Sequence, residues 1–208
     1  MVADSSSIKR AFFEAVREAH DFILKSYGRV SRKYSIPEQA KSTHPFICWS
    51  ESDLRTLIAY FLMQKIRGIG FIHTEVVLKK ADKFKFDGEG KQELWEKAVD
   101  RAKEIRGRKR IAGDIDLAIT PADSDTIPFI LIAEVKYYHY DVRSYGRDPL
   151  HEVQQAYTVL KEFKNVGLTR EIAIVIGDHY YHRTKSSKVK ELEKFVQKHS
   201  SDAIYLKM

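Results

Sequence analysis

The segment that most restricts the fold of this chain is an apolar run that ends in two charges, Phe129-Ile-Leu-Ile-Ala-Glu-Val-Lys136. Successive side chains of a β-strand point to opposite faces of the sheet, and both faces of this run are apolar at its start. A strand of this kind fits the interior of a sheet that is covered on both sides. The run therefore predicts a central strand over residues 129–138.

Hydrophobic periodicity predicts the remaining elements. Apolar residues at helical spacing indicate helices over about residues 7–27, 50–67, 91–105, 149–163 and 187–199. Short β-rich runs indicate strands over residues 71–78, 114–120, 171–176 and 203–206. Residues 121–128 are a short turn-like segment, so the strands on either side are expected to form an antiparallel hairpin. Later alternation of strand and helix favours parallel pairing. We expect an α/β fold with a mixed central β-sheet flanked by helices.

The length of 208 residues fits one main domain. We assign residues 1–49 to an N-terminal helical extension and residues 50–208 to the main domain, with a helical insert at about residues 79–112. A lone cysteine, Cys48, excludes a disulfide within the chain and a Cys-rich zinc site. The sequence lacks both a signal-peptide pattern and an apolar run long enough to cross a bilayer, so the expected location is cytoplasmic, with no membrane partner.

Acidic residues occur on two neighbouring predicted strands, in positions where an unpaired charge is costly. Glu134 and Lys136 share one face of their strand, about 7 Å apart at Cα. Asp114 and Asp116 share a face in Gly113-Asp-Ile-Asp-Leu-Ala-Ile119. The hairpin could place Asp116 opposite Glu134, although sequence alone does not fix the register. An ordinary surface Glu–Lys pair is the alternative, and the flanking apolar runs argue against it.

Two carboxylates with a nearby carbonyl form a hard-oxygen site suited to Mg²⁺ or Mn²⁺. Such an ion polarises a phosphodiester and lowers the pKa of bound water, and a lysine beside it orients that water or stabilises charge on phosphorus. No P-loop, dinucleotide fingerprint or G-x-S-x-G motif is present. The residues at positions 116, 134 and 136 therefore favour phosphodiester hydrolysis.

The pattern of Asp116, then Glu134-Val135-Lys136 on the next strand, resembles the PD-(D/E)xK nuclease superfamily, over roughly residues 50–180. It departs from the pattern at Ile115, where that superfamily often has proline. The resemblance implies a restriction-endonuclease-like or Holliday-junction-resolvase-like core. It also implies a Mg²⁺-dependent deoxyribonuclease, expected to be an endonuclease, that acts on DNA and could form a homodimer.

The resemblance also implies a further acid from a preceding helix or strand. Glu75 lies within the strand over residues 71–78, where an acid needs a metal or a partner. Glu51 opens a helix, where the helix dipole alone explains an acid. Gln154, near Tyr157 on the helix after Lys136, is a further catalytic candidate. We take Asp116, Glu134 and Glu75 as candidate metal ligands, and Asp114 as a weaker one.

Basic and aromatic residues flank the predicted acids. The net charge of +7 favours a polyanionic partner. The candidate nucleic-acid contacts are Arg108, Lys109, Arg110, Tyr138, Arg143, Tyr145 and Arg147, because arginine binds phosphate and tyrosine stacks on unpaired bases. Two alternatives stay open: solvated loops with no ligand, and a nucleic-acid-binding module or complex subunit of the same fold that does not cut.

Overall fold

The computed structural model describes residues 4–33, 50–76, 90–107, 115–122, 128–138, 146–182 and 184–208, with the backbone alone for residues 27–33. The elements in chain order are α1 (Ser5–Lys33), α2 (Glu51–Lys65), β1 (Gly70–Val76), α3 (Lys91–Arg106), β2 (Ile115–Pro121), β3 (Phe129–Tyr138), α4 (Pro149–Asn165), β4 (Thr169–Asp178), α5 (Lys188–Lys198) and β5 (Ala203–Lys207). Cys48 and Asp114 lie outside the described residues.

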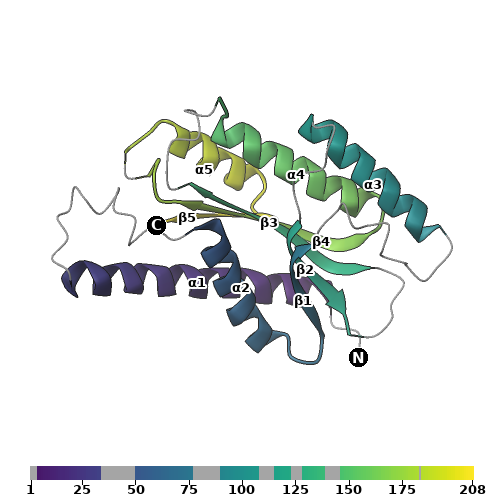
Figure 1. Ribbon diagram of the computed structural model, residues 1–208, viewed down its shortest axis with the longest axis horizontal. Coiled ribbons are helices and arrows are strands. Elements are labelled where there is room, and N and C mark those ends of the chain that lie inside the picture. Colours follow the sequence, from purple (N-terminus) through teal and green to yellow (C-terminus); the bar gives the residue numbers. More distant parts are fainter. Residues whose placement is uncertain are drawn as a thin grey trace.

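The strands form one mixed sheet between two layers of helices (Figure 1). The strand order is β1-β2-β3-β4-β5. The pairs β1–β2 and β2–β3 are antiparallel, whereas β3–β4 and β4–β5 are parallel. Helices α3, α4 and α5 cover one face and α1 and α2 the other (Figure 1). The expected α/β class, the mixed sheet and the hairpin over β2 and β3 are confirmed.

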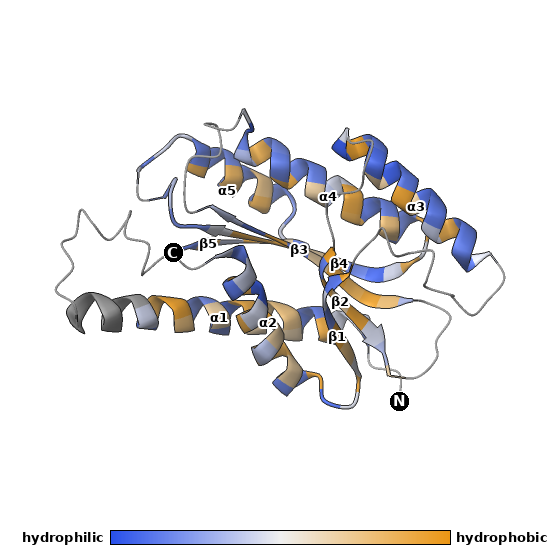
Figure 2. Ribbon diagram, viewed as in Figure 1, coloured by the Kyte–Doolittle hydropathy of each residue, from blue (hydrophilic) through white to orange (hydrophobic). Residues whose placement is uncertain are grey.

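Each face of the sheet has its own hydrophobic core, as the apolar stripes in Figure 2 indicate. On the α3–α4–α5 side, Trp95, Leu160 and Ile174 belong to one buried cluster. On the α1–α2 side, Phe12 and Val135 belong to the other. Strand β3 is buried on both faces along most of its length, which confirms its central position.

Helix boundaries follow local capping chemistry. The side chain of Ser50 accepts a hydrogen bond from the N–H of Asp53 and completes a capping box for α2. Asp148 caps α4, with Pro149 at its start, as expected. Gly68, with φ of 75°, takes the left-handed conformation after α2. The prediction for α1 was too short at both ends, and at its start the side chain of Asp4 accepts a hydrogen bond from the N–H of Ser6.

Helix α1 belongs to the main core, although its sequence precedes the predicted domain boundary. Phe12, Val16 and Ile23 are fully buried, and the Nζ of Lys9 contacts Glu171 at 2.9 Å and Asp202 at 2.6 Å.

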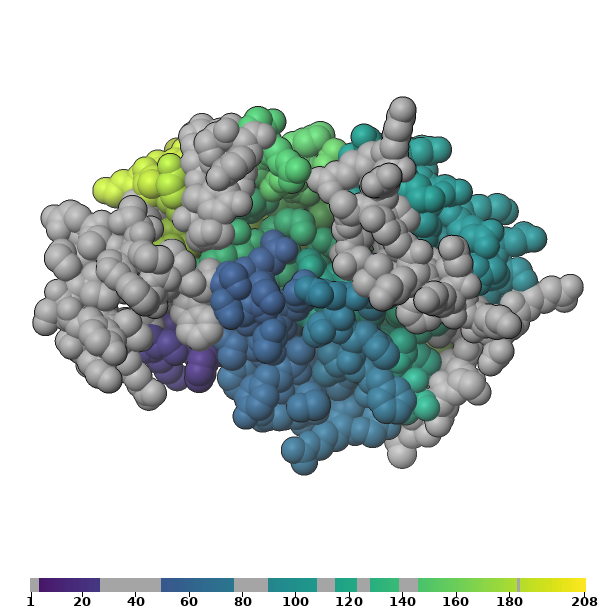
Figure 3. Space-filling view, in the orientation of Figure 1, coloured from purple at the N-terminus to yellow at the C-terminus, as the bar shows by residue number. Residues whose placement is uncertain are grey.

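Helix α2 and β1, coloured blue in Figure 3, form one continuous surface at the front of the molecule. Among the described helices, none combines the length and the apolar character needed to cross a membrane.

Candidate active site

Three carboxylates lie in one row across the first three strands. Leu117 of β2 faces Ala133 of β3, so the preceding residue, Asp116, lies opposite Glu134. The register of β1 and β2 likewise sets Glu75 opposite Asp116. The alternation of side chains predicted that Glu134 and Lys136 share a face, and the turn predicted the hairpin. The observed pairing of β2 with β3 supplies the register that sequence left open.

Asp116 sits where the ladder between β2 and β3 ends. On this side the last paired residues are Leu117 and Ala133. One carboxylate oxygen of Asp116, Oδ2, accepts a hydrogen bond from the N–H of Val135 at 2.7 Å. The side chain therefore satisfies a backbone donor of β3, and this contact fixes the orientation of the carboxylate.

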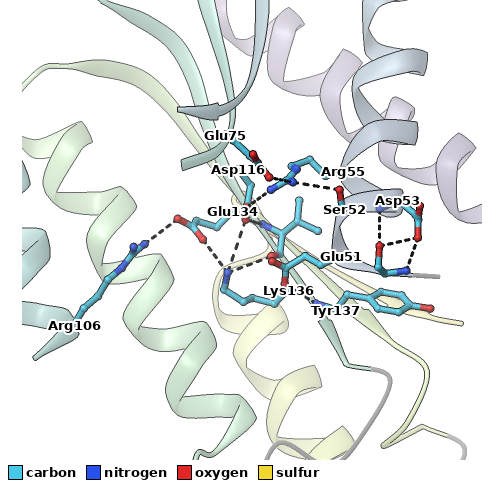
Figure 4. Close-up of polar contacts among 12 residues, drawn as sticks. Glu51, Ser52, Asp53, Arg55, Glu75, Arg106, Asp116, Glu134, Lys136 and Tyr137 are labelled. Carbon is cyan, nitrogen blue, oxygen red and sulfur yellow. Dashed lines mark hydrogen bonds and ion pairs between the residues drawn. The ribbon is translucent and has the colours of Figure 1, made fainter. Parts of the chain in front are cut away.

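Lys136 joins the two acids. Its Nζ lies 2.9 Å from Oε2 of Glu134, 3.8 Å from Oδ2 of Asp116 and 3.2 Å from the carbonyl oxygen of Val135 (Figure 4). The side chain of Glu134 is 2% exposed, that of Asp116 8% and that of Lys136 22%. Three oxygens from two strands thus surround one cationic nitrogen, and the lysine is the most exposed of these three side chains.

Arg55 of α2 reaches Asp116 and Glu75 from the layer formed by α1 and α2. Its Nη1 lies 2.9 Å from Oδ1 of Asp116, and its Nη2 donates to Glu75 and, at 3.4 Å, to Oγ of Ser52. Sequence reasoning missed this residue. The available signal was its position three and seven residues before Ile58 and Leu62, on the buried side of α2.

Glu75 has an unusual backbone conformation for a strand residue. Its φ of 58° lies in the left-handed region, which a residue other than glycine rarely adopts. The side chain is 58% exposed and its carboxylate binds Arg55. Glu75 is therefore at the solvent side of the row, held by an arginine that also binds Asp116.

Arg106, the last residue of α3, contacts Glu134 from the other side. Its Nη2 lies 3.0 Å from Oε1 of Glu134 (Figure 4). Lys136 and Arg106 therefore bind different oxygens of the same carboxylate. The basic cluster at residues 106–110 pointed to this region, but sequence did not indicate a direct contact with Glu134.

Glu51, the other candidate acid, lies beside these groups. Its carboxylate accepts a hydrogen bond from the N–H of Tyr137 at 3.3 Å. Burial raises the pKa of Glu51, with the nearby negative charge of Glu134 adding to the shift and Lys136 opposing it. Helix α2 thus brings both Glu51 and Arg55 to the row of acids, while Glu75 comes from β1.

Acidic and basic side chains from three strands and two helices gather in this cluster. Four carboxyl groups and three cationic side chains of the described residues meet at this end of β2 and β3: Glu51, Glu75, Asp116 and Glu134, with Arg55, Arg106 and Lys136. Burial, followed by the charge of Glu134, raises the pKa of Asp116 to about 7. Burial alone would lower the pKa of Lys136, but the surrounding carboxylates raise it above its usual value, so the ammonium persists. Because neighbouring carboxylates repel one another and raise each other's pKa, a bound cation would be favoured among them.

A divalent ion such as Mg²⁺ needs several oxygen ligands that approach one point. Among the described residues, no group of three or more histidine, cysteine, aspartate or glutamate side chains is arranged to hold a metal. Two carboxylates, Asp116 and Glu134, do approach one point together with the carbonyl of Val135. These hard oxygens suit Mg²⁺ or Mn²⁺, with water completing the coordination. Glu75 is not part of this group, because its carboxylate is turned to Arg55.

Gln154 does not join the acids. It lines an open groove of about 700 Å³ between α4 and α5, together with Tyr157. Its neighbour Gln155 instead donates to the carbonyl oxygen of Ile105 at 3.3 Å, next to Arg106. The structure thus gives no geometric support to the catalytic role expected for Gln154.

Of the seven candidate nucleic-acid contacts, the structure describes Tyr138 and Arg147. Arg108, Lys109, Arg110, Arg143 and Tyr145 lie outside the described residues. The expectation that Tyr138 stacks on a base is wrong, because its side chain is buried. Tyr138 is 2% exposed, and its hydroxyl donates a hydrogen bond to the carbonyl of Pro149 at 3.0 Å. Arg147 is more than half exposed and lies 3.1 Å from Glu152.

Compared with protein-family models, with curated proteins and with solved structures, the chain matches none of them.

Proposed function

We propose that the protein is a Mg²⁺- or Mn²⁺-dependent nuclease that hydrolyses DNA phosphodiester bonds. The observation that carries the proposal is the arrangement of Glu134 Oε2, Asp116 Oδ2 and the Val135 carbonyl around the nitrogen of Lys136. This arrangement is the one that the resemblance to the PD-(D/E)xK superfamily implies. The element order α2, β1, β2, β3, α4, β4, with antiparallel strands followed by a parallel one, agrees with a restriction-endonuclease-like core.

The residues of the site divide the chemistry between them. Asp116, Glu134 and the carbonyl of Val135 would hold the divalent ion, which supplies Lewis acidity toward the phosphate and lowers the pKa of water. Lys136 keeps its positive charge because carboxylates surround it. That ammonium can hydrogen-bond the attacking water or the phosphate oxygen on which negative charge increases. Arg55 keeps Asp116 in place through its Nη1 contact.

A non-cleaving nucleic-acid-binding module or complex subunit is the second candidate. It is favoured by the ion pairs of Asp116, Glu134 and Glu75, each of which has a cationic partner within the chain. A cluster balanced in this way is compatible with folding without metal. The convergence of Asp116 Oδ2, Glu134 Oε2 and the Val135 carbonyl on one point favours the enzyme instead.

A cleavage assay separates these candidates. Supercoiled, linear, branched and single-stranded DNA, and RNA, are incubated with Mg²⁺, Mn²⁺ or EDTA. We expect metal-dependent cutting of DNA that falls by about 100-fold or more in Glu134→Gln and Lys136→Met.

The matched control is Glu171→Gln. Glu171 is also a partly buried carboxylate held by two lysines, Lys9 at 2.9 Å and Lys164 at 3.3 Å, but it lies at the start of β4. The control should cut as the wild type does. Cutting in EDTA, or equal activity in all three variants, would remove the nuclease proposal, whereas DNA binding without cutting would select the second candidate.

A further inference from the structure

The helix inserted between β1 and β2 ends at the acids. Helix α3 buries Trp95, Ala98 and Ala102 on one side. It ends at Gly107, whose φ of 61° allows the left-handed conformation and whose N–H bonds back to the last turn. The side chain of Gln155 holds the carbonyl of Ile105 against α4. These contacts fix the place of Arg106, the last residue of the helix.

Arg106 and Lys136 share Glu134 without competing for an oxygen. Arg106 binds Oε1 at 3.0 Å and Lys136 binds Oε2 at 2.9 Å. A divalent ion held on the Oε2 side would take the place of the ammonium there and leave the contact of Arg106 intact. The guanidinium would then stand on the far side of a carboxylate that binds the ion.

Most of the hydrogen-bonding capacity of Arg106 is not used by its contact with Glu134. A guanidinium has five N–H donors in a plane, and within the described part of the chain the contact with Glu134 accounts for one. The side chain is 13% exposed. Arginine binds phosphate through parallel N–H···O bonds, in a geometry that lysine cannot reproduce.

We propose that Arg106 binds a non-bridging oxygen of a nucleic-acid phosphate at the site, while Glu134 holds the other edge of its guanidinium. The inference rests on the proposed function and goes beyond it, because it makes α3 the element that delivers a phosphate-binding residue. In Figure 4, Arg106 and Arg55 approach the carboxylates from opposite sides, Arg106 contacting Glu134 and Arg55 contacting Asp116.

The test compares Arg106→Gln and Arg106→Lys with the wild type. Affinity for a short DNA duplex is measured by fluorescence anisotropy in a fixed concentration of Ca²⁺, over a range of KCl concentrations. We expect Arg106→Gln to bind roughly tenfold more weakly and to lower the slope of log K against log salt by about one unit, the effect of one lost phosphate contact. Arg106→Lys should keep the slope and bind with intermediate affinity.

The matched control is Arg101→Gln. Arg101 lies on the same helix, is 57% exposed and pairs with Glu104 rather than with the site. This variant should keep both affinity and slope. Mn²⁺ affinity, measured by calorimetry without DNA, should change less than twofold in Arg106→Gln. Arg106 contacts Oε1 of Glu134, whereas the ion would bind Oε2.

An unchanged slope in both Arg106 variants, or a loss confined to Mn²⁺ affinity and thermal stability, would overturn the inference and leave Arg106 as a structural partner of Glu134. If the wild type cuts no DNA but Arg106→Gln loses one unit of slope, the phosphate contact stands and the nuclease proposal fails. If the wild type cuts DNA and the slope is unchanged in Arg106→Gln, the nuclease proposal stands and the phosphate contact of Arg106 fails.

Discussion

Replacing Lys136 by methionine should make the stability of the protein depend on divalent metal. The change keeps the length of the side chain and removes the charge that lies between Glu134 and Asp116, whose side chains are 2% and 8% exposed. Removing one partner of a buried ion pair costs 3–5 kcal/mol. Because Lys136 is 22% exposed, we expect the lower end, about 3 kcal/mol. In EDTA this corresponds to a decrease in Tm of about 6–12 °C for a chain of this size.

Magnesium should restore that loss. An ion present at a concentration one hundred times its Kd stabilises the folded state by about 2.7 kcal/mol. In the wild type the ion must displace the ammonium, whereas in Lys136→Met it meets two carboxylates without a competing cation. The gap in unfolding free energy between the two proteins should therefore narrow as Mg²⁺ is added. Urea denaturation at several Mg²⁺ concentrations, with matched ionic strength, measures this gap.

Lys9→Met is the matched control. Lys9 is also mostly buried, at 14% exposure, and also joins two carboxylates, Glu171 and Asp202. After its removal Glu171 keeps Lys164, and Asp202 keeps the hydroxyl of Tyr157. The control should lose stability that Mg²⁺ does not restore. A gap for Lys136→Met that stays constant with Mg²⁺ would refute the assignment of a metal site to Asp116 and Glu134.

Three further outcomes follow from the structure. Burial raises the pKa of Asp116 from 3.8 to about 7, so the folded state holds this proton more tightly than the unfolded state. In EDTA the stability of the wild type relative to Asp116→Asn should fall as pH rises from about 4 to 7, and a relative rise in urea midpoints would contradict it. Arg55→Gln should cost about 3 kcal/mol because Arg55 is 11% exposed, whereas Glu75→Gln, at 58% exposure, should cost less than about 1 kcal/mol; equal losses on denaturation would show that the buried contact with Asp116 is unimportant. Gly177→Ala should cost roughly 1–3 kcal/mol, because an added Cβ would lie 2.6 Å from Cδ2 of Tyr137 and 3.1 Å from Cδ2 of Leu54; an unchanged Tm would show that these two side chains make room for the methyl group without cost.

Much of the fold was predictable because its signals are local. The apolar run at residues 129–136 defined the central strand, and the short turn before it defined the hairpin. Helix α1 was harder to delimit, because Gly28 disfavours a helix, yet the helix continues to Lys33. Once a helix has formed, each added residue costs little, so composition alone marks its end poorly.

The site was predictable where it depends on strand periodicity. Parity placed Glu134 and Lys136 on one face, and the hairpin brought Asp116 near them. The contacts of Arg55 and Arg106 depend on how helices far along the chain pack against the sheet, 61 and 28 residues from their partners. Periodicity carries no information on that packing, and it gave no sign of the left-handed backbone at Glu75.

The contacts of α1 set a limit on how this chain can fold during synthesis. Lys9 pairs with Asp202, which follows it by 193 residues, and His20 contacts the carbonyl of Lys207 at 2.9 Å. At a translation rate of 5–20 residues per second, roughly 10–40 s separate the appearance of the two ends of the first pair. Throughout that interval α1 lacks these partners near the C-terminal end, so its docking there is completed only after the last strand has been synthesised.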